Sequence, residues 1–328
     1  MHSHPPKYSS KDALPLTHSI FEKQGSLAYV TELGGMLLGK SDEILSSGEL
    51  SSLHGKVNLI FTSPPFPLNR KKRYGNETGD AYIKWLCEFG PLFKEMLAPN
   101  GSIVIEMGNS WEPGEPVMST LAIRALLEFQ MKNNLFLCQE FVWQNPAKLP
   151  TPAQWVNVKR IRVKDSFTRL WWLSPIQNPK ANNRRVLQEY SSAMKDLLKK
   201  GSYNSGKRPS EHNISETAFL KDNGGAIPSS VLTYANTQSG DAYQLYCRKN
   251  EFQLHPARMP SDLAKFFIKF LTEPGDIILD PFGGSNTTGA AAEGLARRWI
   301  SIEASDDYIK GSRGRFGDRI MMDFISQD

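Results

Sequence analysis

One continuous segment near the end of the chain constrains the fold most strongly. Residues 276–303, "DIILDPFGGSNTTGAAAEGLARRWISIE", indicate a buried strand, a glycine-rich turn, a helix of small residues and a second strand. Strands that alternate with helices are typical of an α/β sheet. In a doubly wound sheet such a turn lies at the carboxyl end of its strand, where ligands bind.

The same alternation occurs elsewhere in the chain. Apolar runs predict strands at 57–61, 101–108 and 135–143, and amphipathic patterns predict helices at 80–97, 118–133 and 261–272. Ser261 is placed to cap the last of these helices. We therefore expect a Rossmann-like, doubly wound mixed sheet.

The middle of the chain, residues 176–254, lacks this alternation. It is rich in Asn, Ser, Gly and Lys, as in "KKGSYNSGKRPSEHN". Such a composition is typical of an irregular inserted module whose loops make contacts, and the alternative is a disordered insertion. We expect a flexible arm at 1–24, a main domain at 25–175 plus 255–328, and the inserted module at 176–254.

Composition limits the class of protein. The chain has 40% hydrophobic and 22% charged residues, which is ordinary for a soluble globular protein. No apolar run approaches the length of a membrane-spanning helix, and the first residues do not resemble a signal peptide. Its three cysteines are widely spaced, which argues against a disulfide framework or a metal site and favours the cytosol.

Charge is unevenly distributed along the chain. Between Gln144 and Arg258 there are 18 Lys and Arg residues against 8 Asp and Glu residues, although the net charge of the whole chain is only +5. A locally basic region indicates a surface that binds a polyanion, and the alternative is a solvated loop region.

The glycine-rich turn predicts a nucleoside ligand. Its glycines allow close approach of the backbone, and an acid at the tip of the next strand, Glu303, is placed to accept hydrogen bonds from ribose. The turn has neither the dinucleotide spacing nor a Gly-Lys-Ser/Thr sequence, which favours S-adenosylmethionine over NAD or ATP. The predicted cofactor-binding residues of this turn and strand are Asp280, Pro281, Phe282, Gly283, Gly284, Ser285, Asn286, Thr287, Thr288 and Glu303.

A second turn, "FTSPPF", follows the strand at 57–61. Its two prolines are rigid and lack backbone donors, so alone they are typical of a strand end beside a turn. At the same sheet edge as the glycine turn they suit chemistry on an aromatic amine. Ser63 Oγ and the Pro64 carbonyl can accept the amine hydrogens, Pro65 stiffens the corner, and Phe66 can stack on a flipped base.

These motifs resemble the β-arranged, amino-methylating DNA methyltransferases, in which the catalytic motif precedes the cofactor motif. "TSPPF" is similar to their catalytic motif, "DPFGGSNTTG" to their cofactor motif, and "HPARMP" (255–260) to the segment that closes over the methionine end of the cofactor. The resemblance implies a permuted methyltransferase domain, with His255 and Pro256 as further cofactor-binding residues. It also identifies 176–254 as a target-recognition module.

The Ser-Pro-Pro-Phe form is typical of the cytosine-N4 enzymes of this family. We therefore expect methylation of cytosine N4 in duplex DNA, within a restriction-modification system of the prokaryotic cytosol. Adenine-N6 methylation, methylation of protein side-chain amides and cofactor-free DNA binding are the alternatives. Expected partners are double-stranded DNA and a restriction endonuclease that acts on the same site without a stable complex. We expect a monomer or weak homodimer, without a metal.

Basic residues near the catalytic motif predict contacts with DNA. The runs "RKKRYGN" and "VKRIRVKD" suit phosphate contacts, and long polar side chains of the middle module suit base reading, with Asn223 as a further candidate. The predicted DNA-binding residues are Arg70, Lys71, Lys72, Arg73, Lys159, Arg160, Arg162, Arg184, Arg185, Lys207 and Arg208.

Overall fold

The structure is a computed structural model that describes residues 25–66, 78–207, 209, 213–215, 217, 219–237 and 240–324. A ten-stranded sheet forms its centre, in the order β11-β7-β8-β4-β3-β12-β13-β2-β1-β14. The strands of this sheet are β1 (Leu27–Thr31), β2 (Gly34–Leu38), β3 (Val57–Thr62), β4 (Leu97–Gly108), β7 (Phe136–Gln144), β8 (Phe167–Ser174), β11 (Val231–Thr233), β12 (Ile277–Asp280), β13 (Arg298–Glu303) and β14 (Ile320–Asp323).

The two predicted turn motifs follow neighbouring strands. β12 pairs in parallel with both β3 and β13, and β3 pairs in parallel with β4. β8 is antiparallel to β4 and β7. The expectation of a doubly wound mixed sheet is thus confirmed, and both motifs lie at one edge of the sheet.

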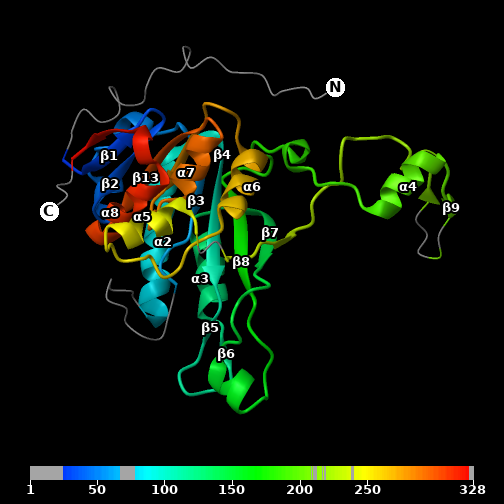
Figure 1. The fold of residues 1–328 in the computed structure, drawn as a ribbon, viewed down its shortest axis with the longest axis horizontal. Helices are drawn as coiled ribbons and strands as arrows, with labels where there is room; N and C mark the ends of the chain where they lie inside the picture. The colour runs from blue at the N-terminus through cyan, green and yellow to red at the C-terminus, as the bar shows by residue number, and fades with distance from the viewer. Residues whose placement is uncertain are drawn as a thin grey trace.

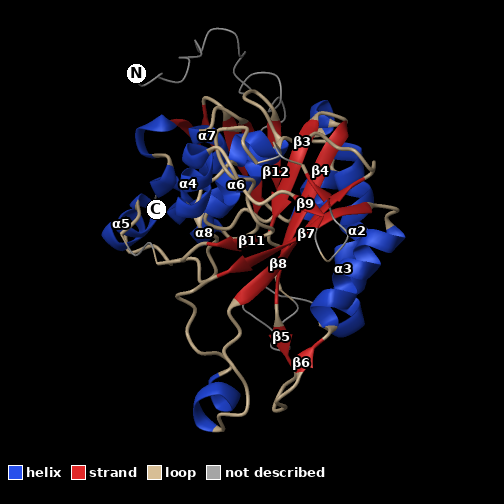
Figure 2. Ribbon diagram, turned by 90° about the vertical axis from the view of Figure 1, so that its right-hand side faces the viewer, coloured by secondary structure: helices blue, strands red, loops and turns tan. Residues whose placement is uncertain are grey.

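Helices cover both faces of the sheet (Figures 1 and 2). Helices α2 (Gly79–Met96) and α3 (Leu121–Lys132) pack on one face, and α6 (Ser261–Leu271) and α7 (Thr287–Gly294) pack on the other. Alternate strand residues belong to the two opposite cores because successive side chains of a strand point to opposite faces. Trp171 and Trp172, neighbours on β8, accordingly pack in different cores.

The beginning of α6 differs from the prediction. Ser261 is its first helical residue, and Pro260 occupies the cap position without a side-chain hydrogen bond. The predicted capping role of Ser261 is therefore wrong. Pro260 is compatible with the cap position because its fixed φ suits the extended conformation that precedes a helix.

A lobe projects from the sheet beyond the ends of β4, β7 and β8. It consists of residues 109–119, which form the hairpin β5 (Ser110–Trp111) and β6 (Met118–Ser119), and of residues 145–166. We call it the hairpin lobe; it forms the lower end of the molecule in Figure 1. The basic sequence at 158–165 lies in this lobe as irregular chain after a single helical turn, Gln154–Val158.

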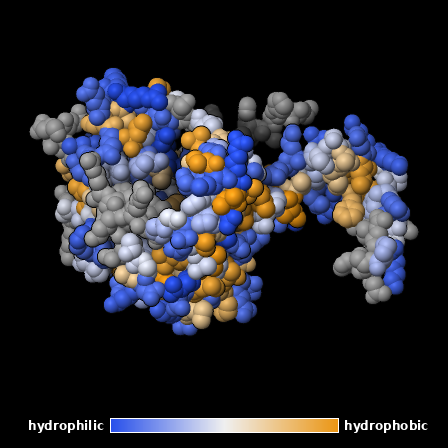
Figure 3. All heavy atoms as spheres, turned by 90° about the horizontal axis from the view of Figure 1, so that it is seen from below, coloured by the Kyte–Doolittle hydropathy of each residue, from blue (hydrophilic) through white to orange (hydrophobic). Residues whose placement is uncertain are grey.

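The middle segment has two structurally different parts. Helix α4 (Ser192–Lys200) and the short strands β9 (Gly206–Lys207) and β10 (Asn213–Ile214) lie on an arm that extends from the body (Figures 1 and 3). In contrast, β11 joins the main sheet beside β7, and α5 (Ala242–Lys249) packs near α8 (Asp306–Ser312). Within the described residues, no helix is long and apolar enough to span a membrane.

Candidate active site

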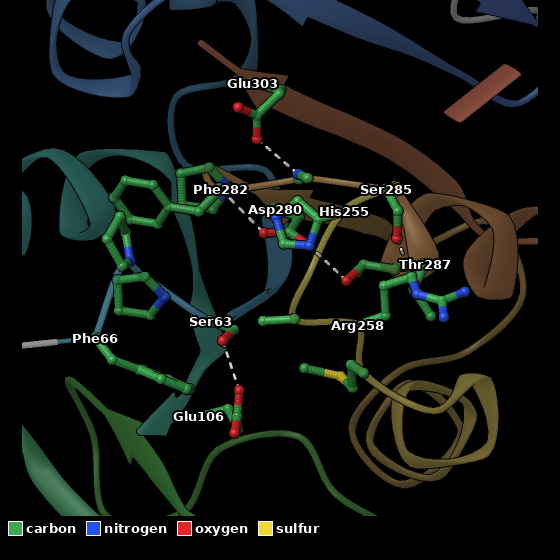
Figure 4. A pocket seen from close by; sticks show the side chains of 18 of the residues that line it. Ser63, Phe66, Glu106, His255, Arg258, Asp280, Phe282, Ser285, Thr287 and Glu303 are labelled. Carbon is green, nitrogen blue, oxygen red and sulfur yellow. Dashed lines mark hydrogen bonds between the residues drawn. The ribbon is translucent and has the colours of Figure 1, made fainter. Parts of the chain in front are cut away.

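Both turn motifs open into one cavity of about 470 Å³. Ser63, Pro64, Pro65 and Phe66 form one part of its wall, and residues of the glycine turn form another (Figure 4). The two parts are joined at their base, where Thr62 Oγ1 donates a hydrogen bond of 2.8 Å to Asp280 Oδ1. The sheet therefore brings together motifs that lie more than 200 residues apart in sequence.

Ser63 is hydrogen bonded to a carboxylate that sequence reasoning missed. Its hydroxyl donates to Glu106 Oε2 at 2.5 Å, and Glu106 is 4% exposed on β4. Burial raises the pKa of Glu106, and the hydrogen bond from Ser63 opposes that rise. With its hydrogen directed at Glu106, Ser63 has lone pairs left to accept a hydrogen bond in the cavity. An acid within the apolar run "SIVIEMG" was the available signal.

Phe66 lies against the backbone of β4. A Cβ added to Gly108 would lie 2.7 Å from Phe66 Cε2, so only glycine leaves room for the ring at this distance. The ring is partly buried and lines the cavity beside Ser63. This placement suits an aromatic surface on which a planar base can stack.

An aromatic group from α2 also lines the cavity. This group consists of Tyr82, Trp85 and Phe89. The ring centroid of Phe282, in the glycine turn, lies 5.6 Å from that of Trp85 and 5.2 Å from that of Phe89, and Tyr82 packs on Trp85. These helical residues carry no predicted function, because an aromatic stripe on an amphipathic helix is typical of a core.

The glycine turn approaches the cavity closely. Gly284 has φ +52°, and a Cβ there would lie 3.0 Å from His255 Nε2. Its left-handed backbone and this close approach both favour glycine. Gly283, Ser285, Thr287, Thr288 and the preceding Pro281 and Phe282 also line the cavity.

Glu303 lies at the tip of β13, where the sequence placed it. Its Oε2 accepts from the backbone N–H of Gly284 at 2.8 Å, and its Oε1 accepts from Ser305 at 2.9 Å. Burial raises its pKa, whereas these backbone hydrogen bonds oppose the rise. The carboxylate lines the cavity with acceptor capacity remaining, because each oxygen has two lone pairs.

Two predicted cofactor ligands have polar groups that stabilise the turn. Asp280 lines the cavity, and its carboxylate accepts from Thr62 and the backbone of Phe282 at Oδ1 and from Thr288 at Oδ2, at 2.6 Å. Asn286 is fully buried and is not among the described residues that line the cavity. Its left-handed backbone, φ 55°, and its side chain cap α7 by accepting from Gly289. A direct contact of Asn286 with a ligand is therefore not supported.

The segment 255–260 borders the cavity beside the glycine turn. His255, Ala257, Arg258 and Met259 line it, whereas Pro256 is absent from the described lining residues. Arg258 lies 3.9 Å from Asp241 and points to the same side of the cavity as Ser285 and Thr287 (Figure 4). The structure also places Lys40, Ser41 and Asp42 at the cavity, with the Ser41 hydroxyl bonded to the carbonyl of Pro281.

Comparison with known proteins assigns the chain to a family. A profile described as DNA methylase, for N6 and N4 methyltransferases, matches residues 57–313. The chain belongs to this DNA methylase family. It is 42% identical over 293 residues to the type II methyltransferase M.PvuII of Proteus hauseri, with 89% of this chain and 86% of the relative covered. It is 26% identical to M.BglII of Bacillus subtilis, over 77% of this chain and 61% of that relative.

Solved structures agree with this assignment. The PvuII DNA methyltransferase, described as cytosine-N4-specific, matches with a TM-score of 0.71 and 35% identity, over 92% of this chain and 91% of that one. A modification methylase of Thermus thermophilus matches in fold, with a TM-score of 0.51 and 18% identity, over 87% of this chain and 94% of that one. The resemblance to DNA amino-methyltransferases of the PvuII type, found from the motifs, is confirmed.

The predicted DNA-binding residues of this DNA methylase are distributed over several regions. Arg70, Lys71, Lys72, Arg73 and Arg208 lie outside the described residues. Lys159 and Arg160 are exposed on the hairpin lobe, whereas Arg162 donates to the carbonyls of Pro116 and Ile161. Lys207 lies on the arm, on β9.

Arg184 and Arg185 lie in a short 3-10 turn beside α6. Arg185 pairs with Glu273 at 2.6 Å and donates to the carbonyl of Thr272 at 2.8 Å. These contacts hold the turn against the end of α6. The prediction that Arg185 reads DNA bases is therefore not supported, because its guanidinium is already used within the protein. Arg184 is exposed.

Proposed function

We propose that the protein transfers a methyl group to the exocyclic N4 of a flipped-out cytosine in duplex DNA. The observation that carries this proposal is the hydrogen bond from Ser63 to Glu106 beside Phe66, in a cavity shared with the glycine turn. Family membership supports the reaction class, and the specificity printed for the PvuII enzyme supports cytosine N4.

The cavity fits S-adenosyl-L-methionine as the methyl donor. Glu303 offers acceptors for ribose hydroxyls, the aromatic group around Phe282 suits an adenine ring, and the absence of side chains on Gly283 and Gly284 leaves room for close approach. The segment 255–259 then faces the methionine end. This cofactor supplies an electrophilic methyl group on a sulfonium.

Ser63 and the Pro64 carbonyl act on the target amine. An exocyclic amine is a poor nucleophile because its lone pair is delocalised into the ring. Two acceptors that bind its hydrogens favour a tetrahedral nitrogen and free that lone pair, and positioning of this kind contributes roughly 7–11 kcal/mol to lowering a barrier. Glu106 accepts the hydrogen bond that the Ser63 hydroxyl donates, so the oxygen of Ser63 is free to act as an acceptor for the amine.

Charge on the amine is stabilised by the same residues. Methyl transfer leaves a positive charge on N4 until a proton is lost to water. The Ser63 oxygen would contact the charged amine, and the Glu106 carboxylate lies directly behind Ser63. Preorganised dipoles and charges in a water-poor site favour such a transition state.

Duplex DNA is the partner that fits the surface around the cavity. Lys148 lines the cavity, and Lys159 and Arg160 lie exposed on the adjoining hairpin lobe. Of the predicted module 176–254, we assign target recognition to the arm between β8 and β11, together with this lobe, because β11 pairs with β7 in the main sheet and α5 packs near α8. We further propose that a separate restriction endonuclease acts on the same DNA site. The methyltransferase is proposed to be a monomer or weak homodimer in the prokaryotic cytosol.

The decisive experiment is mass spectrometry of nucleosides from DNA treated with the full chain and isotopically labelled S-adenosylmethionine. Labelled N4-methylcytosine is the expected product. N6-methyladenine alone would replace the cytosine assignment by the adenine alternative. Label in an added protein but none in duplex DNA would overturn the DNA substrate.

A further inference from the structure

Arg315 lies largely buried behind the glycine turn. It lies in a 3-10 turn, Arg313–Arg315, and its side chain is 11% exposed. Its Nε donates to the carbonyl of Ser285 at 2.6 Å, and its Nη2 donates to the hydroxyl of the same residue at 3.1 Å. Arg315 is not among the described residues that line the cavity, whereas Ser285 is. Its influence on the cavity therefore passes through Ser285.

The other side of the Arg315 guanidinium faces α5. Its Nη1 lies 3.7 Å from Asp241 Oδ2, and its Cζ lies 4.8 Å from the centre of the Tyr243 ring. Asp241 is itself held in place, because it caps α5 by accepting from Gln244 at 2.9 Å. The guanidinium thus joins the glycine turn to this helix.

Close packing leaves the Arg315 backbone little freedom. A Cβ added to its neighbour Gly314 would lie 2.4 Å from Tyr246 Cβ, and one added to Gly311 would lie 2.9 Å from Cys247 Sγ. The 3-10 turn is therefore pressed against α5. A rigid attachment at the backbone lets the planar guanidinium hold a defined position.

The same contacts reach the segment 255–260, which also lines the cavity. The Tyr243 hydroxyl accepts from the backbone N–H of His255 at 2.8 Å, and Arg258 lies over the Tyr243 ring at 5.5 Å. His255 in turn lies close to Gly284. Arg315 and Tyr243 therefore connect the glycine turn with the segment 255–260, and both line the cavity in which the methyl donor is proposed to bind.

We propose that Arg315 is a positioning residue that sets the shape of the glycine turn for the methyl donor. This inference rests on the proposed function. Arginine suits the role because its fork holds the Ser285 carbonyl and hydroxyl together while a third nitrogen faces Asp241. Lysine keeps the charge, but its single nitrogen cannot make these three contacts at once.

The test is Arg315→Lys in the full chain, with calorimetric titration of S-adenosylmethionine. We expect binding of S-adenosylmethionine to be weakened about 10- to 100-fold, the range expected for losing a hydrogen bond from a charged donor. Turnover at saturating cofactor and DNA affinity stay within about threefold of wild type. A purely structural role would lower the melting temperature without this selective effect.

Arg313→Lys is the matched control. Arg313 is buried in the same turn, but its Nη2 pairs with Asp323 of β14 at 2.6 Å. We expect it to lower the melting temperature and leave cofactor affinity unchanged. Equal weakening by both variants would overturn the proposal, as would unchanged affinity in Arg315→Lys.

Two further outcomes separate this inference from the proposed function. If wild-type protein binds no S-adenosylmethionine, the proposed function fails. If wild type binds it and Arg315→Lys does not fold, Asp241→Asn replaces that variant, with an expected weakening of about threefold or more. Wild-type affinity in a folded Asp241→Asn variant would then reject the role of Arg315.

Discussion

The hydroxyl of Ser63 and the carboxylate of Glu106 are 2.5 Å apart although 43 residues separate them in sequence. The register of the sheet causes this. Thr62 on β3 lies opposite Ile105 on β4, so the residues that follow, Ser63 and Glu106, lie side by side where β3 ends. The buried acid is therefore part of the same site as the Ser-Pro-Pro-Phe corner.

Ser63→Ala should lower turnover about 10²–10³-fold, because it removes one preorganised acceptor at the amine. DNA affinity should change little, since Ser63 lies within the cavity rather than on the basic surface. Single-turnover kinetics and gel-shift titration measure the two effects. Unchanged turnover would mean that the Pro64 carbonyl is a sufficient acceptor. Ser46→Ala, an exposed serine on helix α1 (Ser41–Ser46), is the control.

Glu106→Gln should lower turnover about 10- to 100-fold. A glutamine side chain keeps the volume but removes a charged partner of Ser63, a hydrogen bond that contributes about 1.5–3 kcal/mol. The cofactor affinity should not change, because Glu303 and the glycine turn are untouched. If the variant bound S-adenosylmethionine more weakly and kept its turnover, Glu106 would have no role beside Ser63.

The same substitution should change the pH dependence of stability. Burial raises the pKa of Glu106 above its ordinary value of 4.5, so the folded protein holds this proton at pH values where the unfolded chain releases it. Its favourable contribution is therefore complete below the ordinary pKa and is lost as pH rises through the raised pKa. Urea unfolding should be measured from below pH 4.5 upward through the raised pKa. The free energy of unfolding of Glu106→Gln should rise relative to that of wild type as pH rises. A constant difference would contradict the raised pKa.

Gly108→Ala should displace Phe66 and impair use of the DNA substrate. The added methyl group would lie 2.7 Å from the ring, and overpacking of this kind costs about 1–3 kcal/mol. We expect kcat/KM for DNA to fall about tenfold or more, with cofactor affinity unchanged. Gly294→Ala is the matched control, because nothing lies within 4 Å of a Cβ at that position. A loss of cofactor affinity alone would contradict this placement of Phe66.

Asn286→Ala should destabilise the fold rather than weaken cofactor binding selectively. It removes the cap of α7 and places alanine in a left-handed conformation, which together cost roughly 2–3 kcal/mol. Asn286→Gly should cost less, because glycine tolerates that backbone. Thermal unfolding and calorimetric titration measure the two properties. Weaker binding with unchanged stability would restore Asn286 as a ligand.

The double variant Lys159→Gln and Arg160→Gln should weaken DNA binding for all sequences alike. Each lost phosphate contact should reduce the dependence of log affinity on log salt by about 0.9. Titration of DNA at several salt concentrations measures this slope. Lys269→Gln, an exposed residue on α6, is the control and should leave the slope unchanged. An unchanged slope in the double variant would remove the hairpin lobe from the DNA surface.

Several site residues could be predicted because their positions depend on local order along the chain. A glycine turn after a buried strand must lie at the carboxyl end of a parallel sheet, so Gly284 and Glu303 were placed correctly. Asn286 and Arg185 were misjudged for the opposite reason. Their type and position fitted a ligand contact, but burial and partners such as Gly289 and Glu273 use their polar groups within the protein.

The sequence by itself determined the fold class, the family and the chemistry at the ends of two strands, since strand order and local turn residues are sufficient for these. The tertiary structure alone decided which distant side chains join them. Glu106 meets Ser63 through strand register, α2 supplies aromatic rings opposite Phe282, and Arg315 reaches Ser285 through packing on α5. Such pairs depend on register and helix packing across the whole sheet, which a local pattern of residues does not encode.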